Sequence, residues 1–164
     1  MNDVSALSQR SVAFRAAPGT SDETQETRLW LEEHDWLYGL LRSSDNTSPT
    51  FRFPDLISAG VSLLFLRPDA STRIFGYLCG KLVLRDPQTP RRRESMWRGQ
   101  YELLQELQRS PANQHPHPKF QLDQLTTACI ALCREDDESG RLILRQARLN
   151  MAQRAQGWAT RQPG

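Results

Sequence analysis

The chain has 164 residues and a mass of 18.8 kDa, enough for one domain whose core needs no disulfide or metal, which excludes a small disulfide scaffold. Hydrophobic residues make up 38% of it, so we expect a folded domain with unfolded ends. The formal net charge is +2, but residues 1–82 carry 8 basic and 10 acidic side chains, whereas residues 83–164 carry 13 and 9. A negatively charged partner is therefore expected to meet the second half.

Residues 1–20 are rich in Ser, Ala and Arg and show no period, so we predict a disordered leader. They lack the apolar run of a signal peptide, and the longest apolar stretch, 57–66, is too short to span a bilayer. Three cysteines without disulfide-like spacing are typical of a reducing compartment. We therefore expect a soluble, cytoplasmic protein.

The first helix is predicted from Ser21 to about Arg42. Ser21 suits an N-cap, acidic residues follow in the first turns, and apolar residues recur at near-helical spacing. This prediction puts Trp30 and Trp36 on one helix, where they would form a packing face or a surface for a protein partner. Residues 43–49 are predicted to be a loop.

Three further helices are predicted in the middle of the chain. Residues 50–53 alternate polar and aromatic side chains, and Pro54 then opens an apolar helix that ends before Arg67. A helix follows from about 71 to 84, and a last one from 94 to about 108. Between these two, residues 85–93 are predicted to be a proline-broken basic loop.

The last third repeats this pattern. After a proline-rich loop, residues 119–122 show the same short alternation, and Asp123 begins a helix that ends in an acidic turn. The final helix is predicted from Arg141 to about Gln156, and residues 157–164 are expected to fray. The predicted fold is mainly α, a single helical domain over residues 21–156 of about six helices with one or two very short strands.

Two segments of the chain, 49–85 and 118–156, resemble each other. With Phe51 set on Phe120, Ser58 falls on Thr127 and Ile74 falls on Ile143 without gaps. This similarity is typical of a tandem strand-helix-helix repeat. The alternative is two helical hairpins of an α bundle, each with an extended lead-in.

The repeated unit resembles the ribbon-helix-helix family of DNA-binding proteins, with two copies in one chain. The resemblance implies a ribbon of residues 50–53 and 119–122 in the major groove. It also implies that backbone amides at Ser71–Arg73 and Gly140–Arg141 hold phosphates. Alternate residues would anchor the core (Phe51, Phe53, Phe120 and Leu122) or face the groove (Thr50, Arg52, Lys119 and Gln121).

Two clusters of arginine are candidates for phosphate contacts. Arg91, Arg92 and Arg93 lie next to Trp97 and Arg98, whereas Arg141, Arg145 and Arg148 share one face of the last predicted helix. Both clusters are equally typical of a solvated surface.

Other chemistry is weakly indicated. His115, His117, Cys129 and Cys133 are zinc-type ligands, but the two cysteines lie on an apolar helix face, which favours a core role. His34, flanked by acids, is expected on a solvated face. No phosphate-binding loop, dinucleotide fingerprint or hydrolase motif occurs, so we expect neither an enzyme nor a cofactor.

The resulting hypothesis is a DNA-binding regulatory or accessory protein, with a bacterial mobile element as one candidate source. It would act as a monomer or homodimer through the short ribbon and the arginine faces. The alternative is a helical adaptor or assembly subunit that binds another protein or a ribonucleoprotein.

Overall fold

The structure, a computed structural model, describes residues 23–113 and 119–161. This part of the chain is mainly α-helical with a single two-stranded antiparallel sheet, which confirms the predicted fold class. In chain order the elements are β1 (Thr24–Trp30), α2 (Leu31–Leu41), α3 (Phe53–Phe65), α4 (Ala70–Gly80), the 3-10 helix η1 (Leu82–Leu84), β2 (Arg91–Trp97), α5 (Arg98–Arg109), α6 (Leu122–Asp136) and α7 (Arg141–Arg161).

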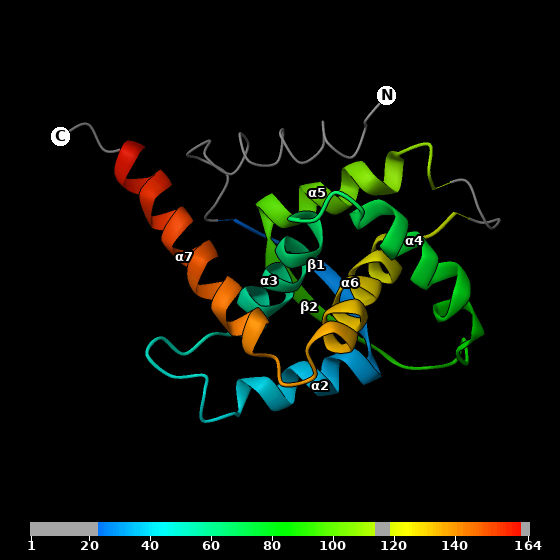
Figure 1. Ribbon diagram of the computed structural model, residues 1–164, viewed down its shortest axis with the longest axis horizontal. Helices are drawn as coiled ribbons and strands as arrows, with labels where there is room; N and C mark the ends of the chain where they lie inside the picture. Colours follow the sequence, from blue (N-terminus) through cyan, green and yellow to red (C-terminus); the bar gives the residue numbers. More distant parts are fainter. Residues whose placement is uncertain (1–22, 114–118, 162–164) are drawn as a thin grey trace.

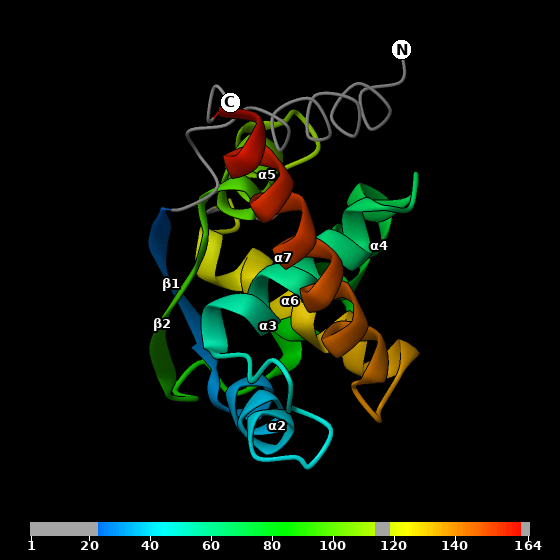
Figure 2. The ribbon, with the colours of Figure 1, turned by 90° about the vertical axis from the view of Figure 1, so that its left-hand side faces the viewer.

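The elements follow the same order twice. A strand, a helix, a connecting segment and two further helices make up β1-α2-α3-α4, and the same series recurs as β2-α5-α6-α7. Figure 1 shows α3 and α6 in the middle of the molecule, and Figure 2 shows β1 and β2 side by side along one face of it. The two strands therefore form a ribbon on the surface, backed by α3 and α6.

The ribbon is symmetric in its pairing. Each strand has seven residues, and the fourth residue of β1, Thr27, lies opposite the fourth residue of β2, Glu94. Thr24 lies opposite Trp97, and Trp30 lies opposite Arg91. An approximate two-fold axis at the central pair thus relates the two strands.

Hydrogen bonds across the halves repeat this symmetry. The backbone N–H of Trp30 donates to Thr127 Oγ1 of α6 at 3.2 Å, and that of Trp97 donates to Ser58 Oγ of α3 at 2.8 Å. Each strand is therefore held by a helix of the other unit. The two units share one hydrophobic core, in which α3 packs against α6.

Matching asparagines hold the segments that lead into α3 and α6. The side chain of Asn46 accepts from the backbone N–H of Phe51 and donates to its carbonyl, and Asn113 does the same for Phe120. Both phenylalanines are buried, as predicted, whereas Phe53 and Leu122 are only partly buried.

The predicted strand positions are wrong. Residues 50–53 and 119–122 form no ribbon; they turn into the helices, where Arg52 N–H donates to Asp55 Oδ2 at 3.0 Å and Gln121 N–H donates to Gln124 Oε1 at 2.8 Å. These two backbone N–H groups take part in capping the helices, so they are not available for strand pairing.

Two predicted helices begin too early. Residues 24–30 were expected in the first helix and form β1, while residues 91–97, expected as a loop and a helix start, form β2. Thr27 and Leu29 alternate into the core, as a half-buried strand requires. What decides their conformation is pairing with a strand far along the chain.

The end of the chain also differs from the prediction. Helix α7 continues to Arg161, beyond the expected end at Gln156. The predicted leader, residues 1–20, lies outside the described residues. Among the described helices, none combines the length and apolar character needed to cross a membrane.

Candidate nucleic-acid interface

The ribbon turns one face to the solvent. Side chains alternate along a strand, and residues opposite each other in an antiparallel pair point the same way. Thr27, Leu29 and Met96 are buried beneath the ribbon. The outer face therefore consists of the remaining alternate positions, which are Thr24, Glu26 and Arg28 in β1 and Arg91, Arg93, Ser95 and Trp97 in β2, with Trp30 buried at its edge.

Two arginines face each other across the middle of this outer face. Arg28 and Arg93 are directly opposite in the register, and both are exposed. Arg93 Nε lies 3.3 Å from Glu26 Oε2, in a pair whose side chains are 72% and 57% exposed. Within the described residues Arg28 has no ion-pair partner. Like charges directly opposite destabilise a sheet, so this pair would be stabilised by an anion on the ribbon.

A third arginine of the outer face is held by its neighbours. The Arg91 guanidinium lies 3.9 Å from the centre of the Trp30 ring and donates to the backbone carbonyls of Pro87 and Thr89. Arg85 covers the same ring at 5.7 Å. Trp30 is thereby packed against two cations, and Arg91 is less free to reach a ligand than Arg28 or Arg93.

Segments before α3 and α6 flank the ribbon. Gln121, at the start of α6, lines an open hollow together with Glu26 and Arg28 of β1. On the other side, α3 begins beside β2, where Asp55 Oδ1 accepts from Trp97 Nε1 at 2.9 Å. The four residues predicted to face the groove lie in these segments, all exposed: Thr50, Arg52, Lys119 and Gln121.

The predicted arginine clusters occupy different surfaces. Arg91 and Arg93 are on the outer face of the ribbon, while Arg92, also exposed, alternates to the other face opposite Leu29. Arg141, Arg145 and Arg148 are exposed on the first turns of α7. Figure 2 shows these turns on the far side of α3 and α6 from the ribbon. The structure therefore does not bring the α7 stripe to the ribbon.

Acidic side chains lie at both helix starts that were expected to hold phosphates. At α4 the Arg73 guanidinium forms a bidentate pair with Asp136, at 2.9 and 3.0 Å, which raises the pKa of Arg73. At the start of α7, Asp137 Oδ2 accepts from the backbone N–H of Leu142 at 2.9 Å. A carboxylate of the protein itself thus bonds a backbone amide at the start of α7, whereas at α4 the acid contacts only the Arg73 side chain.

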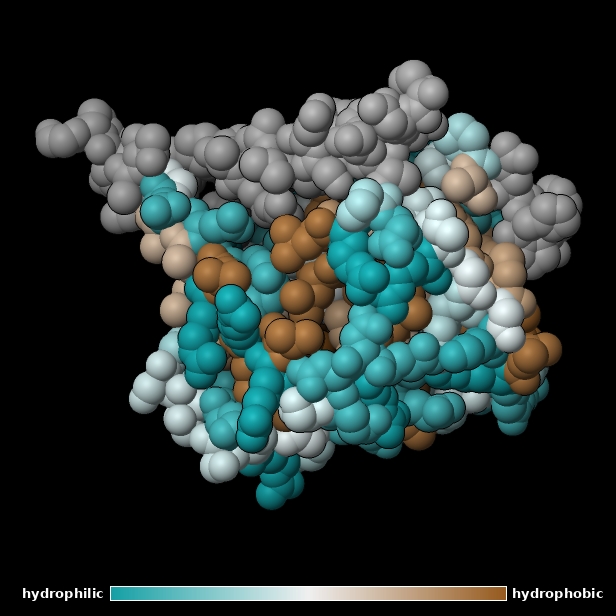
Figure 3. Space-filling model, in the orientation of Figure 1, coloured by the Kyte–Doolittle hydropathy of each residue, from teal (hydrophilic) through white to brown (hydrophobic). Residues whose placement is uncertain are grey.

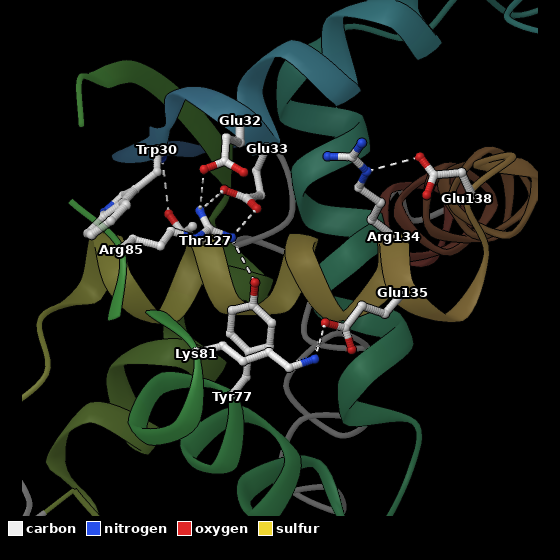
Figure 4. Close-up of polar contacts among 10 residues, drawn as sticks. All are labelled: Trp30, Glu32, Glu33, Tyr77, Lys81, Arg85, Thr127, Arg134, Glu135 and Glu138. Atoms are coloured by element: carbon white, nitrogen blue, oxygen red, sulfur yellow. Dashed lines mark hydrogen bonds and ion pairs between the residues drawn. The ribbon is translucent and has the colours of Figure 1, made fainter. Parts of the chain in front are cut away.

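A buried ion pair lies next to the ribbon (Figure 4). The Arg85 guanidinium donates to both carboxylate oxygens of Glu33, each at 2.7 Å, and to the Tyr77 hydroxyl at 2.7 Å. The Glu33 side chain is 3% exposed. Burial raises the pKa of the Tyr77 hydroxyl, although the nearby Arg85 opposes this shift. The cluster ties α2 to α4 and to the segment before β2, which is a structural role.

The acidic segment around His34 is not a uniformly solvated face. Glu33 is buried, and His34 Nε2 lies 2.7 Å from Glu94 Oε2, while its ring stacks on Phe53 at 4.5 Å. These contacts attach α2 to the central pair of the ribbon and to the start of α3. They account for His34 without a ligand.

Cys129 and Cys133 lie in the core of α6. Burial raises the pKa of both thiols, and the Cys133 thiol donates to the Gly60 carbonyl at 3.4 Å. No group of metal-ligand residues occurs among the described residues. His115 and His117 lie outside them.

The two tryptophans expected on one helix lie on different elements. Trp30 ends β1 and is 3% exposed, whereas Trp36 lies in α2 and donates its indole N–H to the Glu138 carbonyl at 3.1 Å. The predicted surface for a protein partner therefore does not form. Apolar side chains do come to the surface elsewhere, around a hollow beside the end of α3 and the start of α7, lined by Leu63, Leu66, Leu142 and Ile143 (Figure 3).

Sequence reasoning missed Glu26, Arg28 and Ser95. The alternation in TQETRLW was the available signal, because Thr24, Glu26 and Arg28 are polar or charged at every second position. It was hidden because Leu29 and Trp30 also fit the helical spacing of the residues that follow.

Scans of protein-family models and searches of curated proteins and of solved structures find no match to this chain.

Proposed function

We propose that this chain binds duplex DNA by inserting the outer face of the β1–β2 ribbon into the major groove, as a single-chain protein of the ribbon-helix-helix type. A two-stranded ribbon fits the major groove of B-DNA, where side chains can reach base edges. A strand followed by three helices, a series present twice around one ribbon, supports this assignment. A regulatory or accessory role in the cell would follow from such binding.

The single observation that carries the proposal is the exposed pair Arg28 and Arg93. Two guanidinium groups opposite each other on a surface ribbon repel. The Glu26 carboxylate, 3.3 Å from Arg93 Nε, offsets part of this repulsion, and an anion or a hydrogen-bond acceptor over Arg28 would offset the rest. Guanine presents two such acceptors in the major groove, and arginine is the side chain that contacts both at once.

The flanking segments support the same geometry. Arg52 and Lys119 are exposed at the starts of α3 and α6, on the two long sides of the ribbon. Phosphates border the major groove on both sides, so a ribbon in the groove brings these two cations to the backbone. Their contribution would be independent of sequence.

The test is fluorescence anisotropy of the full chain with labelled random duplex and with DNA from its own upstream region, across a salt series. We expect a steep fall of affinity with salt and a preference for one fragment. Arg28→Ala and Arg93→Ala should each weaken specific binding by about 1–3 kcal/mol. Arg52→Ala should weaken binding to all sequences and lower the salt slope by about one.

Arg145→Ala is the matched control. It removes the same charge from an exposed helix position on the far side of the molecule. We expect only a small, sequence-independent effect from it. Equal losses for Arg28→Ala and Arg145→Ala, or no binding at low salt, would contradict the proposal.

The apolar hollow beside α3 and α7 favours a second candidate function, a protein-binding adaptor. Leu66 is 61% exposed and Leu142 is 44% exposed there. Scattered exposed leucines are common, but these two share one hollow. If DNA binding fails, a Leu66→Ser variant that loses an interaction made by the parent chain would support this function.

A further inference from the structure

The outer face of the ribbon is asymmetric although its framework is symmetric. Positions that anchor the ribbon hold similar residues in both strands: Leu29 corresponds to Met96, and Trp30 to Trp97. The other positions of the outer face differ in every case. Thr24 corresponds to Arg91, Glu26 to Arg93, and Arg28 to Ser95.

The differences collect into a charge gradient along the ribbon. Because the strands are antiparallel, residues 28–30 lie beside residues 91–93 at one end, which carries three cations on the outer face, Arg28, Arg91 and Arg93, and Arg92 on the other face. Residues 24–26 lie beside residues 95–97 at the other end, and Glu26 is the only charged residue among these six. The central pair of Thr27 and Glu94 separates the two ends.

We infer that this ribbon recognises a duplex site without two-fold symmetry, with guanine under the Arg28–Arg93 end and a different base pattern under the Glu26–Ser95 end. The inference rests on the proposed function and specifies its ligand. The symmetry of a DNA site mirrors the symmetry of the protein surface that reads it. Here the surface has lost that symmetry at each exposed position.

The side chains at the two ends of the ribbon suit different bases. Arginine pairs with the two acceptors of guanine, whereas a carboxylate accepts from the amino group of cytosine and repels acceptors and phosphates. Ser95, opposite Glu26, can bond to either type of base edge. Reversing the ribbon on a site would place Glu26 over guanine acceptors, so orientation is selected as well as sequence.

The experiment is selection of binding sites from a random duplex pool with the full chain. The expected result is an enriched motif that is not a palindrome, with guanine concentrated at one end. Glu26→Gln should change the base preference at the other end, while the release of Arg93 from its pair with Glu26 should leave the preference for guanine intact or stronger. Arg28→Ala should lower discrimination at the guanine end by about 10-fold or more.

A symmetrised variant gives the sharper test. Thr24→Arg, Glu26→Arg and Arg28→Ser together place in β1 the outer residues of β2, and all three positions are exposed. Selection with this variant is expected to enrich a palindrome. Arg93→Ser, which only removes a cation from the guanine end, is a second variant and should flatten the preference there.

The outcomes separate the inference from the proposed function. A palindromic motif selected by the parent chain would overturn the inference and leave DNA binding intact. A non-palindromic motif with the guanine end unchanged in Arg28→Ala and Arg93→Ser would also overturn it. Failure to enrich any sequence, with no binding at low salt, would overturn both.

Discussion

Glu33 and Arg85 form a bidentate ion pair that is nearly sealed from water, between the first turn of α2 and the segment before β2 (Figure 4). The Glu33 and Arg85 side chains are 3% and 15% exposed. Arg85 also bonds to Tyr77 and covers Trp30 at the end of the ribbon. This pair therefore links the position of the ribbon to the helices behind it.

Glu33→Ala is expected to lower the free energy of unfolding by about 3 kcal/mol, because it leaves the largely buried Arg85 cation with only the exposed Glu32 carboxylate, 3.8 Å away. Urea unfolding followed by circular dichroism measures this change. The control is Glu135→Ala, which breaks an exposed pair with Lys81 and should cost much less stability. Similar losses for both variants would mean that Arg85 is solvated after all.

Replacing both members of the buried pair tests the same point from the other side. Glu33→Met with Arg85→Met removes the unpaired cation, so the double variant should be more stable than Glu33→Met alone. A double variant that loses the sum of the two single losses would show that the two residues do not couple.

Gly60 allows α3 and α6 to approach closely. A Cβ atom added at this position would lie 2.5 Å from Ile130 Cδ1, so the helices or the isoleucine must move. We expect Gly60→Ala to destabilise the protein by about 1–3 kcal/mol through overpacking. A thermal or denaturant unfolding curve measures the effect.

Gly76→Ala is the matched control for Gly60. Gly76 lies within α4, and an added Cβ would meet no atom within 4 Å among the described residues. Alanine favours the helix there, so stability should rise by about 0.5–1 kcal/mol. A loss of stability in Gly76→Ala would contradict the placement of α4.

The three cysteines are expected to react at very different rates. Cys79 is exposed, whereas Cys129 and Cys133 are buried and their thiol pKa values are raised by burial. A thiol reagent should therefore label one cysteine in the native protein at pH 8 and all three after unfolding. Fast labelling of two or more native cysteines would show that α6 is more open than in the structure.

Asp137 is expected to make stability depend on pH in the acid range. Hydrogen bonds from the Ser139 hydroxyl and the Leu142 backbone N–H lower the pKa of the Asp137 carboxyl in the folded state. Its contribution is therefore fully present above the unfolded pKa of about 3.9 and is lost as the pH falls through the lower folded value.

The variant Asp137→Asn checks this dependence. It should be less stable than the parent at pH 7, and the difference should shrink as the pH falls below about 4. Asp45→Asn, which removes an exposed carboxylate with no side-chain partner in the part of the chain that the structure describes, is the control for the loss of one negative charge. A constant difference across pH for Asp137→Asn would mean that only the shape of the side chain matters.

Helices with a strong apolar period could be predicted from the sequence. The apolar run after Pro54 forms α3, and the apolar residues after Asp123 form α6. Both helices could be predicted because the apolar residues that each one buries lie within one short segment of the sequence. The similarity of Phe51 to Phe120 and of Ser58 to Thr127 was also visible. In the structure each pair occupies matching places beside Asn46 and Asn113 or beside the two strands.

The candidate site could be predicted only in part. Arg91 and Arg93 were identified as a basic cluster, but as a loop, and Arg28 was assigned to a helix. Thr50, Arg52, Lys119 and Gln121 were identified as the ribbon and instead flank it. The residue types suggested nucleic acid before any of their positions were known.

The amino-acid sequence by itself determined the helical character of this protein, its repeated apolar pattern and its supply of exposed arginines, because these depend on local propensity and composition. Tertiary structure decided where the strands are and which arginines meet. Pairing of β1 with β2 joins residues far apart in the chain, and its free energy comes from contacts that no local window contains. Arg28 and Arg93 become neighbours only through that pairing.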